Sequence, residues 1–288
     1  MTTKHYTILY LLQQASNQLS AVTDCAALEA EVLLAHALQK PRSYLHAFQE
    51  EVIASDQVKI FDEYLQRRLQ QEPIAYIIGK REFWSLEFLV NRDTLIPRQE
   101  TEILVESVLQ LFPEKNEARL VADLGTGCGA IALALSHERP QWTMIATDKS
   151  AQALEIAKQN AKHLNCHSVS FYEGSWCAAL PSIQFDAIVS NPPYLSETEW
   201  KTHKKGLIFE PDSALVSGSD GLVAIREISE CAKNHLKPGG YLLIEHGFSQ
   251  GAEVRKIFAS SQYVDVHSIC DFSVNERVTI GCFPGFLC

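Results

Sequence analysis

The sequence predicts an α/β fold, in which an open, mostly parallel sheet carries helices on both faces and follows a small N-terminal helical bundle. Three observations support this prediction. The N-terminal 76 residues show only the helical spacing of apolar residues, and residues 120–282 alternate short apolar strands with amphipathic helices. The length of 288 residues is enough for about two domains. Alternation of strands with helices is typical of a sheet whose neighbouring strands run parallel.

The composition is that of a folded protein with a negative net charge. Hydrophobic residues make up 46% and charged residues 21%, which excludes extended disorder and fibrous repeats. The formal net charge is −10, opposite in sign to that of proteins that bind phosphate backbones, so we expect no direct contact with nucleic acid. No stretch resembles a signal peptide or approaches the ~18 apolar residues of a membrane helix. We therefore expect a cytoplasmic protein with no membrane partner.

The eight cysteines are scattered along the chain. None forms a Cys-x-x-Cys pair, and none lies at zinc-finger spacing from histidines. The pattern predicts reduced thiols and no metal site. The cysteines are Cys25, Cys128, Cys166, Cys177, Cys231, Cys270, Cys282 and Cys288.

Residues 1–76 predict a bundle of four short amphipathic helices. The first covers residues 6–19, and Asp24 is positioned to cap the second, which ends before Pro41. A short third helix follows, and a fourth begins near residue 55. No catalytic set of residues occurs here, so we expect this domain to recognise the substrate.

Residues 77–97 predict a hairpin-like linker, because turn residues alternate there with aromatic and β-branched ones. The remaining residues, 98–288, form the predicted catalytic domain. Its strands are expected at residues 120–124, 143–147, 169–172, 185–190, 241–245, 264–269 and 277–282. A ligand of such a sheet lies at the carboxyl ends of its first strands.

A glycine-rich turn follows the first of these strands, in Asp123-Leu-Gly125-Thr126-Gly127-Cys128-Gly129. Glycines let the backbone turn tightly and let a ligand approach the N-terminus of the next helix. Asp148 ends the next strand, where a carboxylate can accept both hydroxyls of a ribose. Gly125, Gly127 and Ala130 also satisfy the dinucleotide pattern, so the turn alone leaves a nicotinamide enzyme as an alternative.

The segment Asn191-Pro192-Pro193-Tyr194 follows another predicted strand. The Asn191 side-chain oxygen and the Pro192 carbonyl are acceptors that can hold both N–H bonds of an NH2 group. A nitrogen bonded to an sp2 centre attacks a methyl group poorly, so orientation and charge stabilisation favour the reaction. The prolines make the carbonyl rigid, and Tyr194 offers a flat face to a planar substrate. The segment predicts methyl transfer to an amide or amino nitrogen.

Together the motifs resemble those of the S-adenosylmethionine-dependent methyltransferases, whose cationic cofactor suits the acidic Asp123 better than a pyrophosphate does. Further segments, from about residue 67 to the C-terminus, resemble one family, the peptide chain release factor glutamine N5-methyltransferases. These segments are Glu72-Pro-Ile-Ala-Tyr-Ile-x-Gly79, Glu82-Phe-Trp-x-Leu86, Leu95-Ile-Pro-Arg98-x-x-Thr-Glu102, Phe209-Glu-Pro211 and Asn275-Glu-Arg-Val-Thr279.

This resemblance implies a Rossmann-like, seven-stranded sheet and S-adenosyl-L-methionine as the cofactor. It also implies methylation of the glutamine in the Gly-Gly-Gln motif of class I release factors, which modulates translation termination. The implied cofactor contacts are Asp123, Gly125, Thr126, Gly127, Cys128, Gly129, Asp148, Trp176 and Asn191. The implied substrate contacts are Asn191, Pro192, Pro193, Tyr194, Arg98 and Glu210, of which Asn191, Pro192 and Tyr194 carry the chemistry.

The sequence departs from the family pattern at a few positions outside the Asn-Pro-Pro-Tyr segment. Gln71 replaces a usual glycine, and Gln99-Glu100 replaces Pro-Asp or Pro-Glu. Ser175 replaces an acidic residue before Trp176, which puts a contact with the adenine amino group in doubt.

Three alternatives remain on the sequence alone. One is a paralogous enzyme that methylates a glutamine of a ribosomal protein, and another is an amino-methyltransferase of DNA or RNA bases. The third, from a different class, is a non-catalytic module that binds an adenosine ligand. The intact Asn-Pro-Pro-Tyr segment argues against this last alternative, and the charge argues against the second.

Overall fold

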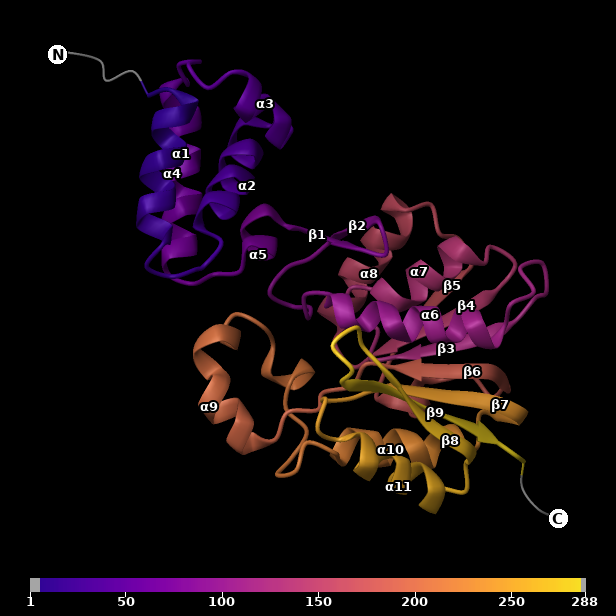
Figure 1. Ribbon diagram of the computed structural model, residues 1–288. Coiled ribbons are helices and arrows are strands. Elements are labelled where there is room, and N and C mark those ends of the chain that lie inside the picture. Colours follow the sequence, from indigo (N-terminus) through magenta and orange to yellow (C-terminus); the bar gives the residue numbers. More distant parts are fainter. Residues whose placement is uncertain (1–5, 286–288) are drawn as a thin grey trace. The chain divides into compact units, whose positions relative to one another are not determined.

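The computed structural model describes residues 6–285, except for the side chains of residues 203–205. The chain divides into two compact units, residues 1–79 and residues 80–288, each with its own apolar core (Figure 1). Among the described residues, no helix is long and apolar enough to cross a membrane.

The first unit is a bundle of helices, as the spacing of its apolar residues predicts. Its helices are α1 (Ile8–Leu19), α2 (Ala26–Leu38), α3 (Arg42–Ala47), α4 (Ser55–Leu69) and α5 (Ile74–Ile78). In α4, Val58, Phe61 and Leu65 recur three or four residues apart and are buried on one face. The predicted N-terminal helical bundle is confirmed, with α5 as an additional short helix.

The start of α2 differs from the expectation, because Asp24 does not cap it. The N-cap residue is Cys25, with no side-chain cap. Instead, the Thr23 hydroxyl accepts the Cys25 N–H at 3.2 Å and donates to Glu29 at 3.1 Å. Glu29 also accepts from Arg68 of α4 at 2.8 Å, so this cluster fixes the start of α2 against another helix.

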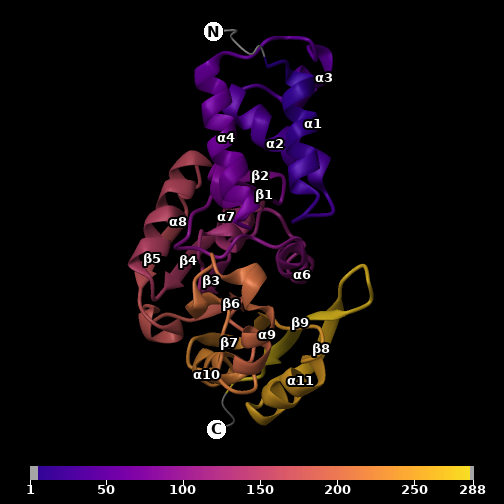
Figure 2. The same cartoon turned by 90° about the vertical axis from the view of Figure 1, so that its left-hand side faces the viewer.

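The second unit contains a seven-stranded sheet in the order β5-β4-β3-β6-β7-β9-β8. Its strands are β3 (Leu120–Leu124), β4 (Thr143–Asp148), β5 (Val169–Glu173), β6 (Phe185–Ser190), β7 (Leu236–Glu245), β8 (Val264–Cys270) and β9 (Glu276–Phe283). The first five run parallel, and β9 pairs antiparallel with β7 and β8. The predicted seven-stranded, mostly parallel sheet is confirmed, and Figure 2 shows β8 and β9 at one edge of it.

Helices cover both faces of this sheet (Figure 1). One face carries α6 (Glu102–Leu111), α7 (Ala130–Glu138) and α8 (Ala151–His163), and the other carries α10 (Val223–Ala232) and α11 (Gly251–Ser260). A further helix, α9 (Glu197–Leu207), follows β6, and short 3-10 turns occur as η1 (Gln99–Thr101), η2 (Trp176–Ala179) and η3 (Asp212–Ala214). All six residues of β6 are buried, as expected for a central strand covered on both sides.

A small hairpin of β1 (Lys80–Phe83) and β2 (Leu86–Leu89) begins the second unit. Its backbone is held by side chains of two helices: Trp84 N–H donates to Glu102 of α6 at 2.8 Å, and Leu89 N–H donates to Asn160 of α8 at 2.7 Å. The buried Asn160 also donates to the Leu89 carbonyl, so it pairs both backbone groups of that residue.

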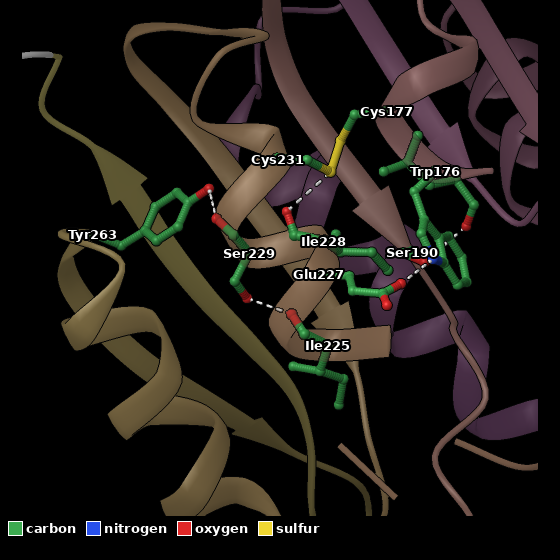
Figure 3. Close-up of a disulfide and its surroundings, with 10 residues drawn as sticks. Trp176, Cys177, Ser190, Ile225, Glu227, Ile228, Ser229, Cys231 and Tyr263 are labelled. Carbon is green, nitrogen blue, oxygen red and sulfur yellow. Dashed lines mark hydrogen bonds between the residues drawn. A yellow bond between two sulfur atoms is a disulfide. The ribbon is translucent and has the colours of Figure 1, made fainter. Parts of the chain in front are cut away.

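Two of the eight cysteines are joined in a disulfide, which corrects the expectation of reduced thiols throughout. The bond links Cys177 of η2 to Cys231 of α10, 54 residues apart in sequence (Figure 3). Neither cysteine belongs to a recognisable spacing pattern, and only the packing of η2 against α10 brings them together. Five others are free, namely Cys25, Cys128, Cys166, Cys270 and Cys282, and Cys288 lies outside the described residues.

Candidate active site

The carboxyl ends of the parallel strands surround one cavity in the second unit. β3 leads into the glycine turn, β4 ends at Asp148, and β6 leads into Asn191. Because parallel strands end at the same edge of a sheet, these distant segments meet there. The cavity is lined by Arg92, Asp93, Thr94, Leu95, Gly125, Gly127, Asp148, Lys149, Ser150, Ala153, Gly174, Ser175, Trp176, Asn191, Pro192, Pro193, Pro211, Ser213 and Ala214.

The glycine turn presents bare backbone to this cavity. Gly125 and Gly127 have φ angles of 73° and 57°, in the left-handed region that favours glycine. A Cβ on Gly127 would meet nothing within 4 Å, whereas one on Gly125 would come within 3.1 Å of the Trp176 ring. A side chain at either position would narrow the cavity, so these glycines leave space for a ligand.

Asp123 lies behind the turn and not on the cavity wall. Its Oδ2 accepts from the Thr126 hydroxyl at 2.6 Å and from Ala132 N–H at 3.3 Å, so it joins β3, the turn and α7. Burial raises the pKa of Asp123 to about 7, and Asp148 adds to this effect, while the bonds from Thr126 and Ala132 oppose it. The structure therefore places Asp123, Thr126, Cys128 and Gly129 outside the cavity lining, where they shape the turn.

Asp148 faces the cavity and fixes two backbone groups. Its Oδ2 accepts Gly127 N–H at 2.8 Å, and its Oδ1 accepts Ser150 N–H at 2.9 Å. Each carboxylate oxygen has further acceptor capacity, which a diol could use. The cavity therefore offers paired acceptors beside the exposed backbone of the glycine turn.

Trp176 forms another part of the wall, from the first position of η2. Its indole N–H donates to Glu227 of α10 at 3.0 Å, and the adjacent Cys177 is bonded to Cys231 of the same helix (Figure 3). Trp176 has a φ of 46°, a backbone conformation uncommon for a bulky residue. Two side-chain links to α10 thus hold the ring against the cavity.

Asn191 stands at the cavity edge with its amide oriented by a hydrogen bond. Nδ2 donates to the Thr101 hydroxyl of η1 at 3.0 Å. Thr101 is buried, so the NH2 end of the amide points into the protein. Oδ1 is then the atom of this side chain that can accept a hydrogen bond from a ligand.

The rest of the Asn-Pro-Pro-Tyr segment is held by its own contacts. Pro192 and Pro193 line the cavity, and the Tyr194 carbonyl accepts from Gln250 at 3.0 Å. Burial is the main cause that raises the pKa of the half-buried Tyr194 phenol, and Glu245 acts in the same direction. The Tyr194 phenol is therefore neutral and no base at neutral pH, and Tyr194 is not among the residues that line the cavity.

The structure pairs Arg98 with Glu210, two residues expected to contact the substrate. The Arg98 guanidinium forms an ion pair with Glu210 Oε1, and Glu210 Oε2 accepts Ile96 N–H at 3.1 Å. Glu210 is buried, and neither residue lines the cavity. The pair therefore joins two segments that line the cavity. One is Arg92–Leu95, which precedes Ile96, and the other begins at Pro211, which follows Glu210.

Several cavity residues were missed in the sequence, because they belong to no motif with a recognisable spacing. Residues 92–95 precede Ile96-Pro97-Arg98, and Ser213 and Ala214 follow Phe209-Glu210-Pro211. In the sequence they could have been found only by their position next to two segments that resemble the family. Thr101 was also missed, although it belongs to a quoted segment, because its role depends on a contact with Asn191. Among the described residues, no group of His, Cys, Asp and Glu could hold a metal ion.

The residues around the cavity fit a cofactor that contains adenosine. The glycine backbone leaves room, the Asp148 carboxylate can accept from a ribose, and the Trp176 ring offers a flat apolar face. Asp123 carries one further buried oxygen, Oδ1, without a hydrogen-bond partner among the described residues.

Comparison with known proteins decides the family. Residues 10–79 match the PrmC N-terminal domain, and residues 99–265 match the methyltransferase small domain. The release factor glutamine methyltransferase of Shewanella oneidensis is 45% identical over 276 residues, which are 96% of each chain. The chain belongs to the release factor glutamine methyltransferase family. The enzyme of that name from Xylella fastidiosa is 47% identical over 258 residues, 90% of this chain and 94% of its own.

As a member of the release factor glutamine methyltransferase family, the protein is a methyltransferase, and solved structures agree with its fold. A methyltransferase from Pyrococcus furiosus superposes with a TM-score of 0.50 and 20% identity, covering 78% of this chain and all of that one. At this identity the likeness concerns the fold alone. The family predicted from the glycine turn and the Asn-Pro-Pro-Tyr segment is confirmed.

Proposed function

We propose that this methyltransferase transfers a methyl group from S-adenosyl-L-methionine to the side-chain amide nitrogen of the glutamine in the Gly-Gly-Gln loop of class I release factors. The observation that carries the proposal is the Asn191 amide, whose NH2 end is bonded inward to Thr101. The relatives named release factor glutamine methyltransferase support the same substrate. In this proposal the protein substrate is the partner, and no nucleic acid or membrane takes part.

The cofactor occupies the cavity at the carboxyl edge of the sheet in this proposal. Asp148 holds the ribose hydroxyls, the backbone at Gly125 and Gly127 lies against the cofactor, and Trp176 packs on the adenine. When bound, S-adenosyl-L-methionine supplies an electrophilic methyl group on a sulfonium. Asp123 acts indirectly, by holding Thr126 and the start of α7 in place.

The Asn-Pro-Pro-Tyr segment positions the target amide. Asn191 Oδ1 accepts one N–H of the glutamine NH2, and the Pro192 carbonyl accepts the other, so the nitrogen is oriented toward the methyl group. Both acceptors stabilise the positive charge that develops on nitrogen as the bond from methyl to sulfur breaks and a neutral thioether is left. The methylated nitrogen would then release its extra proton to water. Tyr194, neutral and half-buried, packs against the planar amide. The first unit, which has a core of its own, recognises the folded release factor.

A methyl-transfer assay tests the proposal. The intact protein and cofactor labelled in the methyl group are incubated separately with a class I release factor, a ribosomal protein and DNA or RNA. The expected product is release factor that carries one methyl group on the Gly-Gly-Gln glutamine, located by peptide mass analysis. A release factor with that glutamine replaced by alanine is the matched control. Methylation of this control, or of another substrate in preference, contradicts the proposal.

A further inference from the structure

Glu245, the last residue of β7, is a buried carboxyl beside the Asn-Pro-Pro-Tyr segment. β6 and β7 run parallel with Ser190 opposite Ile244, so Asn191 and Glu245 are the next residues along the two strands. Glu245 is 2% exposed, and its Oε2 has no hydrogen-bond partner among the described residues. A buried carboxyl with an unpaired oxygen is unfavourable for folding, so its presence at this edge requires another explanation.

The Asn191 amide needs a group that distinguishes its two ends. They are nearly equal in size, but one donates hydrogen bonds and the other accepts them. A hydroxyl alone does not choose between them, because it can donate to Oδ1 as well as accept from Nδ2. The Thr101 hydroxyl gives its one hydrogen to the Glu245 carboxylate, so toward Asn191 it can only accept, as it does from Nδ2. A carboxylate can only accept. Glu245 therefore attracts the NH2 end of Asn191 and repels Oδ1.

We propose that Glu245 is a positioning residue for methyl transfer, which holds the NH2 end of Asn191 inward so that Oδ1 faces the substrate. This inference rests on the proposed function. A reversed Asn191 would direct its own N–H groups at the N–H groups of the glutamine amide, and the substrate nitrogen would lose an acceptor. The Glu245 charge also favours the positive charge that develops on that nitrogen.

The surroundings of Glu245 set both the pH range in which it is ionised and the strength of its field at Asn191. Burial raises the pKa of Glu245 to about 7, while the nearby Thr101 hydroxyl, Arg277 and the Asn191 amide lower it. Glu100 of η1 raises it further. Because water does not reach this carboxylate, its field at the Asn191 amide is screened less than that of a surface charge.

The experiment is a double-mutant cycle in the full-length protein, with kcat for release factor methylation as the main readout at pH 8. Glu245→Gln replaces the acceptor-only carboxylate by an amide that can pair with either end of Asn191. We expect kcat to fall about tenfold, with the KM for the cofactor within about threefold. Thermal unfolding should show no loss of stability, because the variant removes a buried charge.

The second arm uses Asn191→Asp, whose two carboxylate oxygens are equivalent and have no orientation to fix. In this background the Glu245 charge repels the new carboxylate, so Glu245→Gln should raise kcat severalfold. A reversal of sign between the two backgrounds is not expected of a residue that only stabilises the fold. If Glu245→Gln fails to fold, Glu245→Met serves as the apolar variant of similar length, with the same expected loss.

The control is Asp186→Asn, which removes another largely buried carboxylate from β6, at the end opposite Asn191. Asp186 pairs with Lys237 and Arg119 there, so its loss should leave kcat unchanged. A kcat within threefold of wild type for Glu245→Gln, or the same loss in both backgrounds, overturns the inference. These results leave the proposed function intact, because that function fails only if the wild-type protein does not methylate the release factor.

Discussion

The Asp148 carboxylate accepts the N–H of Gly127 at 2.8 Å, across 21 residues of sequence. This bond joins the end of β4 to the glycine turn after β3, so the carboxylate expected to hold the cofactor also shapes the turn. Replacement of Asp148 should therefore weaken cofactor binding in two ways. It removes an acceptor for the ribose hydroxyls, and it removes the bond that holds the glycine turn in place.

Asp148→Ala should weaken S-adenosyl-L-methionine binding strongly. Hydrogen bonds to a charged group contribute about 1.5–3 kcal/mol each, so loss of even one raises the Kd by about tenfold or more. Titration calorimetry measures this change, with Glu155→Ala as the control, since Glu155 is exposed and pairs with Lys158 on the same helix. Tight binding of NADH and none of S-adenosyl-L-methionine by the wild-type protein would instead favour a dinucleotide enzyme.

Asn191→Ala should lower kcat about 10²–10³-fold while the protein stays folded. The change removes one oriented acceptor aimed at charge that develops in the transition state. Single-turnover methylation of the release factor measures the rate, and calorimetry checks that the cofactor still binds. Wild-type methylation by a folded, cofactor-bound variant would remove Asn191 from the mechanism.

A chain that begins at Lys80 should bind the cofactor but lose most activity on intact release factor. The second unit keeps its own core and all the cavity residues, whereas the first unit is absent. Circular dichroism and calorimetry establish folding and cofactor binding. Full activity of the truncated protein on whole release factor would show that the first unit does not recognise the substrate.

The free energy of unfolding should fall as the pH rises from about 4.5 to about 7, because burial raises the pKa of Glu245 and of Asp123 to about 7. Within this window the folded protein holds protons that the unfolded chain has released. Glu245→Gln should therefore gain stability over wild type at pH 8, by up to about 3 kcal/mol, and little at pH 4. Urea unfolding at the two pH values checks this, and an equal gain at both would contradict the raised pKa.

Reduction of the Cys177–Cys231 disulfide should lower the stability of the second unit. A link across 54 residues restricts the unfolded chain and contributes up to about 4 kcal/mol in the chain-entropy model. Cys231→Ser should unfold at lower temperature, whereas Cys270→Ser, at an exposed free cysteine, should match wild type. Unfolding that is identical with and without reductant would mean that the bond adds nothing to stability.

The sequence by itself determined the elements and the family. Helical spacing predicted the N-terminal bundle, and the alternation of strand and helix predicted the sheet, because burial on one or both faces sets the period of apolar residues. The glycine turn and the Asn-Pro-Pro-Tyr segment were recognisable because their chemistry lies in a few consecutive residues. The predictions for Asp24, Cys177 and Cys231 were wrong. At the start of α2 the Cys25 N–H bonds Thr23 and not Asp24, and Cys177 and Cys231 are joined in a disulfide instead of being reduced thiols.

Only the tertiary structure decided how the site is assembled. Thr101 meets Asn191 across 90 residues, Arg98 pairs with Glu210 across 112, and Glu245 lies beside Asn191 through the pairing of β6 and β7. Such partners carry no local pattern, since a threonine or a glutamate has the same propensities whether or not it contacts the site. Their roles follow from which strands end side by side, and that depends on the packing of the whole sheet.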